Sequence, residues 1–180
     1  MATPPDFTAG QVLTAAQMNK IGLWLVKTQT IGTAVSSVTV TDAFTADYHS
    51  YLIRVNGGTA STSLLLNMTL GSTVTGYYYG GFTATYAGGA PTSFANANTT
   101  SFVAAGTGET GGLALRVELT NPQAADETGY LNLYATQRTT GSGGMAVGYL
   151  NDTTAYTAFT LTTSTGTVTG GTIYVYGMRD

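Results

Sequence analysis

Apolar and polar residues alternate along most of the chain from Trp24 onward, which is the pattern of strands that bury one face. In "SYLIRVN" (residues 50–56), Tyr51, Ile53 and Val55 fall on one face and polar residues fall on the other. Because the side chains of a strand point alternately to its two sides, the apolar face is predicted to lie in the core. The same alternation recurs in "SLLLNMTL" (63–70), "GLALRVEL" (112–119), "GYLNLYAT" (129–136), "AYTAFTLTT" (155–163) and "GTIYVYGMR" (171–179).

Turn-forming residues separate the alternating segments, and no helical pattern lies between them. About nine strands spaced in this way predict an antiparallel β-sandwich. A parallel α/β sheet is excluded because its strands need helical connections. The fold class is therefore all-β. The turn signals are Asn56-Gly57-Gly58, Gly88-Gly89-Ala90-Pro91, the segment 141–144, Asn151-Asp152 and Gly170-Gly171.

Residues 80–111 fit the alternating pattern poorly. This segment, "GGFTATYAGGAPTSFANANTTSFVAAGTGETG", is apolar in places but dense in glycine, asparagine and alanine. It is either a long loop over the sandwich or a set of irregular edge strands. Long loops without structure of their own are uncommon unless they are functional, so both interpretations stay open.

The stretch "DFTAGQVLTAAQMNKIG" (6–22) predicts a short helix ahead of the β domain. Thr14 and Gln17 have the spacing of a capping box, and Gly22 is placed to end the helix in a left-handed conformation. Such a helix has only about two turns, and isolated helices of that length are marginal in water. It must therefore dock onto something.

Apolar residues in and around the predicted helix exceed what two turns can bury by themselves. They either pack on the chain's own β domain or dock onto a neighbouring chain. We therefore expect two parts, an anchoring segment with a short helix (residues 1–28) and a β-sandwich domain (residues 29–180). The candidate docking residues are Phe7, Val12, Leu13, Met18, Ile21 and Trp24.

Charge excludes several classes of partner. Only 8% of the 180 residues are charged, the net charge is −3, and the six lysines and arginines are scattered along the chain. Nucleic-acid binding normally needs clustered cations, so it is not expected. No apolar run approaches the ~20 residues of a membrane-spanning helix, so membrane insertion is not expected either. No signal peptide is visible, which predicts synthesis in a cytoplasm.

The sequence offers little catalytic chemistry. His49 is the only histidine, and it shares a turn-like segment with Asp42 and Asp47, which is more typical of a solvated turn than of a catalytic dyad. No G-x-S-x-G elbow presents a serine. "GTGETG" (106–111) matches a dinucleotide-binding motif, but a strand rather than a helix follows it, so it is predicted to be a hairpin loop.

Metal and cofactor sites are not expected either. The chain has no cysteine and one histidine, which leaves no zinc-type cluster. The oxygen-rich segments Asn151-Asp152 and 121–127 could hold calcium, although neither has an EF-hand pattern. The nine acidic residues are too sparse to favour the paired carboxylates of a polysaccharide-degrading enzyme. We therefore expect a protein that is not an enzyme and has no cofactor.

Tyrosines are the most informative surface candidates. "TGYYYGGFTATY" (75–86) places Tyr77, Tyr78, Tyr79 and Tyr86 close together beside a glycine-rich segment. If this is a strand, Tyr78 must point away from Tyr77 and Tyr79. These four tyrosines are candidates for a subunit or receptor contact, because tyrosine is rigid and amphipathic. The alternative is that some lie in the core and the others at the rim of the sheet.

Five segments resemble small bacteriophage virion proteins of the fibre or minor tail type. The opening "FTAGQVLTAAQMN" (7–19) resembles their N-terminal stretch, and the closing "GTIYVYGMRD" (171–180) resembles their ending. The segments between them resemble the β-sandwich domain, of jelly-roll type, that such proteins carry. These are "VTVTDAFTADYHSYLIRV" (38–55), "LNMTLGSTVTGYYYG" (66–80) and "VELTNPQAADET" (117–128).

The resemblance implies a structural or adhesive role in the virion rather than an enzyme. It implies a short tail fibre or minor tail protein in or near host attachment, with a head fibre or capsid decoration protein as the alternative. Such proteins are often homotrimers, and the N-terminal segment would contact other virion proteins. A host cell-surface glycan is an implied partner. The resemblance assigns no binding residues.

Overall fold

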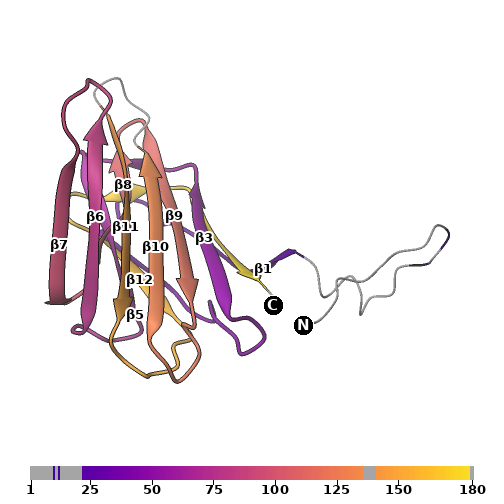
Figure 1. Cartoon of the computed structure of the whole chain (residues 1–180). Helices are drawn as coiled ribbons and strands as arrows, with labels where there is room; N and C mark the ends of the chain where they lie inside the picture. Colours follow the sequence, from indigo (N-terminus) through magenta and orange to yellow (C-terminus); the bar gives the residue numbers. More distant parts are fainter. Residues whose placement is uncertain (1–9, 11, 13–21, 136–140, 179–180) are drawn as a thin grey trace.

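The computed structural model describes residues 10, 12, 22–135 and 141–178 (Figure 1). These residues form fourteen strands and no helix, and every ladder between the strands is antiparallel. The all-β prediction is confirmed in this part of the chain. The short helix predicted after Thr14 lies outside the described residues.

Eight of the strands pair as a nested set. In chain order the first pairs with the last, the second with the seventh, the third with the sixth and the fourth with the fifth. Four of them lie side by side in the order β1 (Leu23–Thr30), β14 (Thr172–Met178), β3 (Ser50–Asn56) and β9 (Gly112–Thr120). The other four lie in the order β2 (Ser37–Val40), β12 (Phe159–Thr163), β5 (Leu64–Leu70) and β8 (Phe102–Glu109). β9 belongs to both groups, because its first half pairs with β8 and its second half pairs with β3.

Four more strands extend the sheet beyond β9. The second half of β9 also pairs with β10, and the order then continues through β11 and β6 to β7 at the edge (Figure 1). β4 and β13 are short and pair with each other as a separate two-stranded sheet. The bounds are β10 (Thr128–Ala135), β11 (Ser142–Leu150), β6 (Tyr77–Thr85), β7 (Thr92–Thr99), β4 (Thr59–Ala60) and β13 (Val168–Thr169).

The segment 80–111 is not a long loop. It contains most of β6, all of β7 and all of β8, so the interpretation as strands is the correct one, with β7 at a sheet edge. Its alternation is weak because glycine and alanine occupy positions where the backbones of neighbouring strands approach closely. A Cβ atom added to Gly81, for example, would lie 2.9 Å from Ala146 Cα in β11. These strands also account for much of the difference between about nine predicted strands and the fourteen described.

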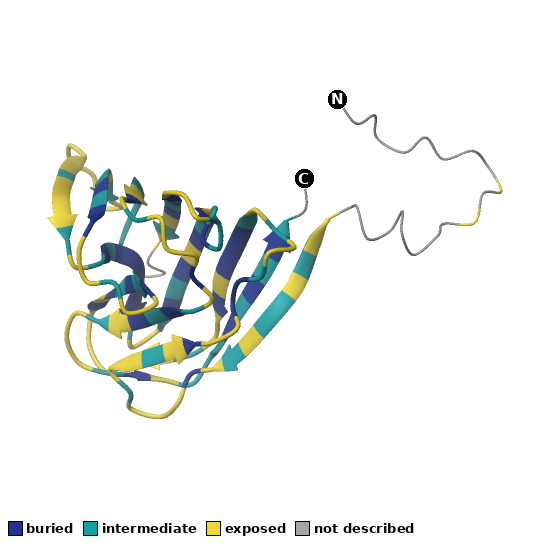
Figure 2. Ribbon diagram, turned by 90° about the horizontal axis from the view of Figure 1, so that it is seen from below, coloured by how far each residue is buried: buried dark blue, intermediate teal, exposed yellow. Residues whose placement is uncertain are grey.

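One continuous core holds the two groups of strands together, and buried residues gather where the strands face each other (Figure 2). As predicted, Tyr51, Ile53 and Val55 of β3 all point inward. Phe102 of β8 lies near the centre of the core. Its ring stacks on Tyr130 with 4.1 Å between ring centroids. Burial of such rings is a major stabilising contribution in a domain of this size.

The start of β1 bears on the expected division of the chain. Leu23, Trp24 and Leu25 are paired with β14, and the ladder resumes after a register shift at Lys27. Residues 23–28, which were assigned to the anchoring segment, therefore belong to the sheet. A separate anchoring segment would end before β1.

Candidate functional site

The candidate site is the outward face of the extension formed by β10, β11 and β6. On each of these strands, alternate residues point away from the core, and those positions carry apolar side chains or glycine. Three cross-strand rows result: Gly129–Tyr149–Tyr78, Leu131–Val147–Gly80 and Leu133–Met145–Phe82. We call the seven larger side chains of these rows the outward apolar face: Tyr78, Phe82, Leu131, Leu133, Met145, Val147 and Tyr149.

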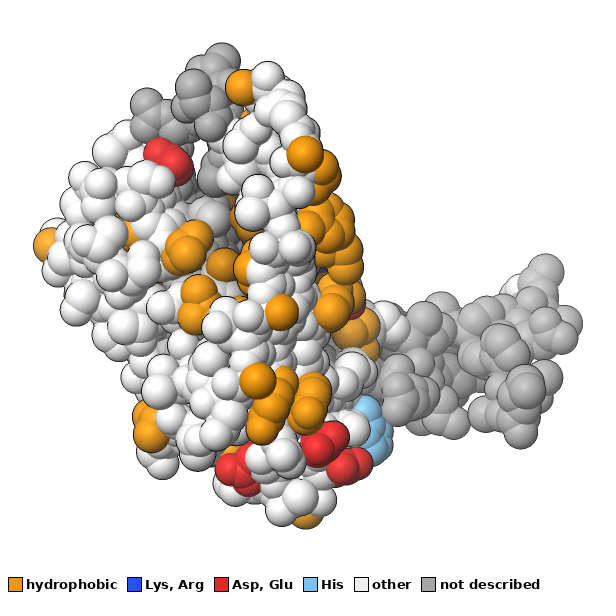
Figure 3. All heavy atoms as spheres, turned by 60° about the vertical axis from the view of Figure 1, so that its left-hand side comes forward, with side chains coloured by type: hydrophobic (Ala, Val, Ile, Leu, Met, Phe, Trp, Pro, Cys, Tyr) orange, Lys and Arg blue, Asp and Glu red, His pale blue; other side chains and the backbone are white. Residues whose placement is uncertain are grey.

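This face is open to solvent in the single chain. Val147 at its centre is 48% exposed, and Leu133 and Phe82 on either side are 47% and 45% exposed. The space-filling view shows hydrophobic side chains gathered along this side of the molecule (Figure 3). A contiguous apolar patch of this kind on a soluble protein usually marks an interaction surface.

Two stacked tyrosines form one end of the outward apolar face. Tyr78 of β6 and Tyr149 of β11 are opposite each other in the ladder. Their rings are nearly parallel, with an angle of 7° and 5.1 Å between centroids. Because each ring restricts the other, both are held in fixed positions before any partner arrives, which lowers the entropy lost on binding.

No charged side chain lies on the outward positions of the described parts of β10, β11 and β6. The nearest charges in the sheet are on β9, where the Arg116 guanidinium donates to Glu118 Oε1 at 3.1 Å. This ion pair neutralises itself at the border of the patch. The patch is therefore suited to an apolar, tightly packed contact rather than to an electrostatic one.

The four candidate tyrosines separate into two kinds. Tyr78 and Tyr86 are accessible, and Tyr86 is 53% exposed just after β6. Tyr77 and Tyr79 point into the core, with exposures of 0% and 6%. On the outward side of the sheet, contact by this group is thus limited to Tyr78 and Tyr86, as the alternation of a strand requires.

The hydroxyl of Tyr77 has a structural role. It accepts a hydrogen bond from Leu70 N at 2.8 Å and donates to the Thr73 carbonyl at 3.0 Å, which ties the turn between β5 and β6 to the core. Burial raises the pKa of Tyr77 to about 12, although the bond from the Leu70 amide opposes this shift. The hydroxyl thus stays protonated at physiological pH and keeps both bonds.

Most of the candidate docking residues cannot be placed. Phe7, Leu13, Met18 and Ile21 lie outside the described residues. Val12 is described and is 84% exposed. Trp24 lies in β1, half-buried, and its indole Nε1 is buried without a hydrogen-bond partner in the described structure.

The candidates from the sequence do not include Val147, Tyr149 or Leu133. Glycines at 141, 143 and 144 suggested a turn, and this obscured β11. The alternation Met145, Val147, Tyr149 was nevertheless present and could have identified the strand. That β6 is its neighbour on the side away from β10 could not be read from the sequence, because the β11–β6 pair joins distant segments.

The acidic residues singled out in the sequence make contacts within the chain. Asp42 pairs with Lys27 at 3.5 Å, and the Asp42 side chain is 85% exposed. Asp152 accepts from Thr154 N at 2.7 Å and from the Tyr156 hydroxyl at 2.9 Å, so its carboxylate holds its own loop. The motif "GTGETG" lies at a hairpin, with its first four residues in the end of β8 and its last two in the turn to β9. In the described residues, no three potential metal ligands of the His, Cys, Asp or Glu type come together.

Comparison of the chain with protein-family models, with curated proteins and with solved structures gives no match. Within the described residues, no helix has the length and apolar character needed to cross a membrane.

Proposed function

We propose that the chain is a non-enzymatic structural protein of a bacteriophage virion, a short tail fibre or minor tail protein that acts in or near host attachment. The observation that carries this proposal is the outward apolar face, an uncharged surface on three neighbouring strands. An assembly component needs such a surface, whereas an enzyme needs a cleft with reactive groups. The virion as the setting comes from the resemblance of five sequence segments.

The partner we propose for the outward apolar face is a second copy of the chain, with a homotrimer favoured. The surface is regular, apolar and free of charge, which is typical of interfaces between permanently associated subunits. Other virion proteins would be contacted by the segment ahead of β1. A host cell-surface glycan would be contacted elsewhere on the domain.

We also propose that the eight nested strands form a jelly roll. Their pairing, first with last and inward to the fourth with the fifth, is what results when one long hairpin of four strand pairs is rolled up. The four strands β10, β11, β6 and β7 would then be an addition to the jelly roll, and they carry the interaction surface.

Replacing Val147 with glutamate is expected to break the oligomer. Val147 lies at the centre of the outward apolar face, between Leu131 and Gly80. An unpaired carboxylate buried there costs more than about 2.7 kcal/mol, so self-association should weaken at least about 100-fold. Sedimentation velocity over a range of concentrations measures this directly.

The matched control is Val74→Glu, because Val74 is 65% exposed and lies outside the outward apolar face. It should leave the oligomeric state of the parent protein unchanged. Circular dichroism checks that both variants keep the β fold. A parent chain that is monomeric at all concentrations, or a Val147→Glu variant that associates as the parent does, contradicts the proposed interface.

The proposed function is tested on intact phage particles with a gold-labelled antibody raised against the β domain. Label at the tail end supports a fibre or minor tail protein. Label over the head instead assigns the chain to the alternative role, a head fibre or decoration protein that coats or stabilises the capsid. Particles without label, when the same antibody binds the free protein, contradict a virion role.

A further inference from the structure

A hollow of about 420 Å³ lies on the opposite side of the extension from the outward apolar face. Its size falls within the range of about 300–1,000 Å³ that is usual for small-ligand sites. One wall is the inward face of the extension, and the other is formed by β8 and the start of β5. The lining residues are Leu65, Tyr79, Thr83, Phe94, Asn96, Val103, Ala104, Thr107, Tyr134 and Ser142.

Glycines on the inward face let two aromatic rings lie flat against the sheet. Tyr134 is opposite Gly144 in the ladder, and a Cβ atom at Gly144 would lie 3.0 Å from the Tyr134 ring carbon Cζ. Phe94 is likewise opposite Gly81, where a Cβ atom would lie 2.9 Å from Phe94 Cζ. Each ring therefore covers a glycine of the neighbouring strand, and the two rings form apolar surfaces within the hollow.

The other wall contains an irregularity in β8. The register between β5 and β8 shifts between Leu66 and Met68, and Ala104 adopts a left-handed conformation with φ of 59°. This conformation is unfavourable for alanine by roughly 1–2 kcal/mol. Asn67 Oδ1 accepts from Ala104 N at 3.3 Å, and Asn132 Nδ2 donates to the Ala104 carbonyl at 2.8 Å. The two asparagines thus hold the bulge in place, and bulges of this kind often re-aim side chains beside binding sites.

Two buried polar atoms beside the hollow have no hydrogen-bond partner among the described residues. They are the Tyr130 hydroxyl and Asn132 Oδ1, on the same face of β10 as Tyr134. Both residues are almost fully buried, with exposures of 4% and 0%. Burial raises the pKa of Tyr130, and the neighbouring Tyr79 and Tyr134 raise it further, so this hydroxyl lies close to two tyrosines that line the hollow. Unpaired buried polar atoms commonly indicate a site for water or for a polar ligand.

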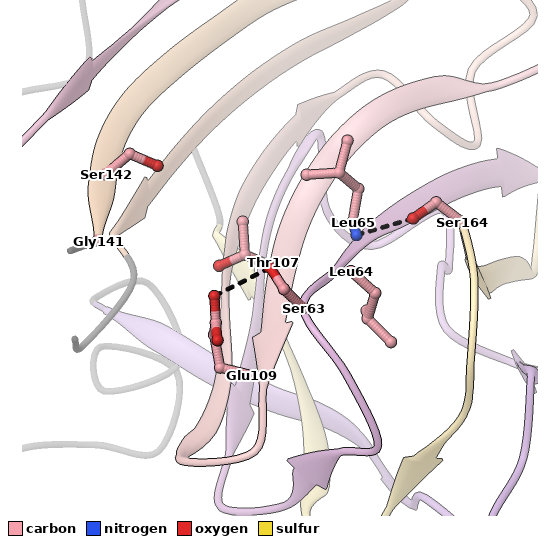
Figure 4. Close-up of a pocket in the computed structure, with 8 residues that line it drawn as sticks. All are labelled: Ser63, Leu64, Leu65, Thr107, Glu109, Gly141, Ser142 and Ser164. Carbon is pink, nitrogen blue, oxygen red and sulfur yellow. Dashed lines mark hydrogen bonds between the residues drawn. The ribbon is translucent and has the colours of Figure 1, made fainter.

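A second hollow of about 330 Å³ adjoins the first and shares Leu65, Thr107 and Ser142 with it. Figure 4 shows that Thr107 and Ser142, from different parts of the sheet, point toward the same gap. At its far side Ser63 Oγ donates to Glu109 Oε1 at 3.0 Å. The two hollows together make a groove with an aromatic part and a part lined by hydroxyl groups and the Glu109 carboxylate.

We propose that this groove binds a neutral saccharide, with the sugar ring against Tyr134 and Phe94. The faces of a sugar ring carry C–H groups that pack on aromatic rings, while its hydroxyl groups require hydrogen bonds from side chains such as Asn96, Thr83 and Ser142. The larger hollow is lined by no charged residue, which suits an uncharged ligand. This inference rests on the proposed role in host attachment, because the saccharide would come from the host cell surface.

The test is a titration of the full isotope-labelled chain with glucose, galactose, N-acetylglucosamine and their short oligomers, followed by amide chemical shifts. Binding of at least one of these probes should shift the amides of Phe94, Asn96 and Tyr134. Tyr134→Ala should then weaken the affinity about tenfold or more. Asn96→Asp should also weaken the affinity, because it introduces a charge and removes the amide donor. Asn96 is exposed, so this variant should keep the fold.

The matched control is Tyr174→Ala, which removes a tyrosine on β14 that stacks on Tyr176, away from the groove. It should leave the affinity unchanged. The inference is overturned if no probe shifts the groove amides, if the shifts gather elsewhere, or if both groove variants bind as the parent does. Binding of an apolar dye in the groove without binding of any saccharide would indicate a site for an apolar peptide, and it would also overturn the inference. The titration uses the isolated protein, whereas the labelling uses intact particles. Either experiment can therefore contradict its own proposal while the other supports the proposal that it tests.

Discussion

Replacing Phe102 with alanine is expected to lower the free energy of unfolding by about 3–5 kcal/mol. Phe102 is fully buried, its ring stacks on Tyr130, and it meets Tyr77 edge to face with 4.8 Å between centroids. The variant loses the transfer free energy of the ring and leaves a cavity that two large neighbours cannot close without leaving their own positions. A loss of this size is a large fraction of the stability of a typical domain. Denaturant unfolding at a fixed protein concentration measures it.

Tyr86→Ala is the control for this experiment, because it removes an aromatic side chain that is 53% exposed. Its effect should stay below about 1 kcal/mol. If Phe102→Ala costs no more than the control, the position of Phe102 at the centre of the core is contradicted. A change in the slope of the unfolding curve would instead indicate altered compactness of the variant.

Replacing Gly171 with alanine is expected to destabilise the protein by about 2–5 kcal/mol, from left-handed strain and from overpacking. Gly171 has a φ of 87° just before β14. An added Cβ atom would lie 2.9 Å from the Gly57 carbonyl carbon and 3.0 Å from Gly58 N. The obstacle is backbone rather than a flexible side chain, so the turns before β14 and after β3 would have to separate.

Gly170→Ala is a control one residue away. Gly170 also has a positive φ, 67°, but a Cβ atom there would meet nothing within 4 Å. Its cost should therefore be only the conformational strain, about 1–2 kcal/mol. Thermal and denaturant unfolding of both variants separate strain from close approach. If both variants lose the same free energy of unfolding, the close approach of the two turns contributes nothing to the cost of Gly171→Ala.

These two glycines show how far local sequence information reaches. The dipeptide Gly170-Gly171 predicts a turn, and a turn is present between β13 and β14. The sequence does not distinguish the two positions, because both are glycines in the same turn. Only the approach of the Gly57-Gly58 turn, more than a hundred residues earlier in the chain, makes Gly171 the more demanding position.

The tyrosine cluster shows the same division for the candidate site. Alternation correctly required Tyr78 to point away from Tyr77 and Tyr79. It did not indicate which side was the core, nor that Tyr149 would stack on Tyr78. Phe94 and Tyr134 likewise come together only through the intervening strands β6 and β11.

The sequence by itself determined that this protein is built of antiparallel strands, where most of those strands lie, and which residues of β3 face the core. These features depend on a period of two and on turn residues, which act within a few positions of each other. The tertiary structure decided that segment 80–111 is three strands, that the outward apolar face forms on β10, β11 and β6, and that a groove lies behind it. These depend on which strands become neighbours, and long-range pairing is chosen by the burial of the whole chain rather than by any local pattern.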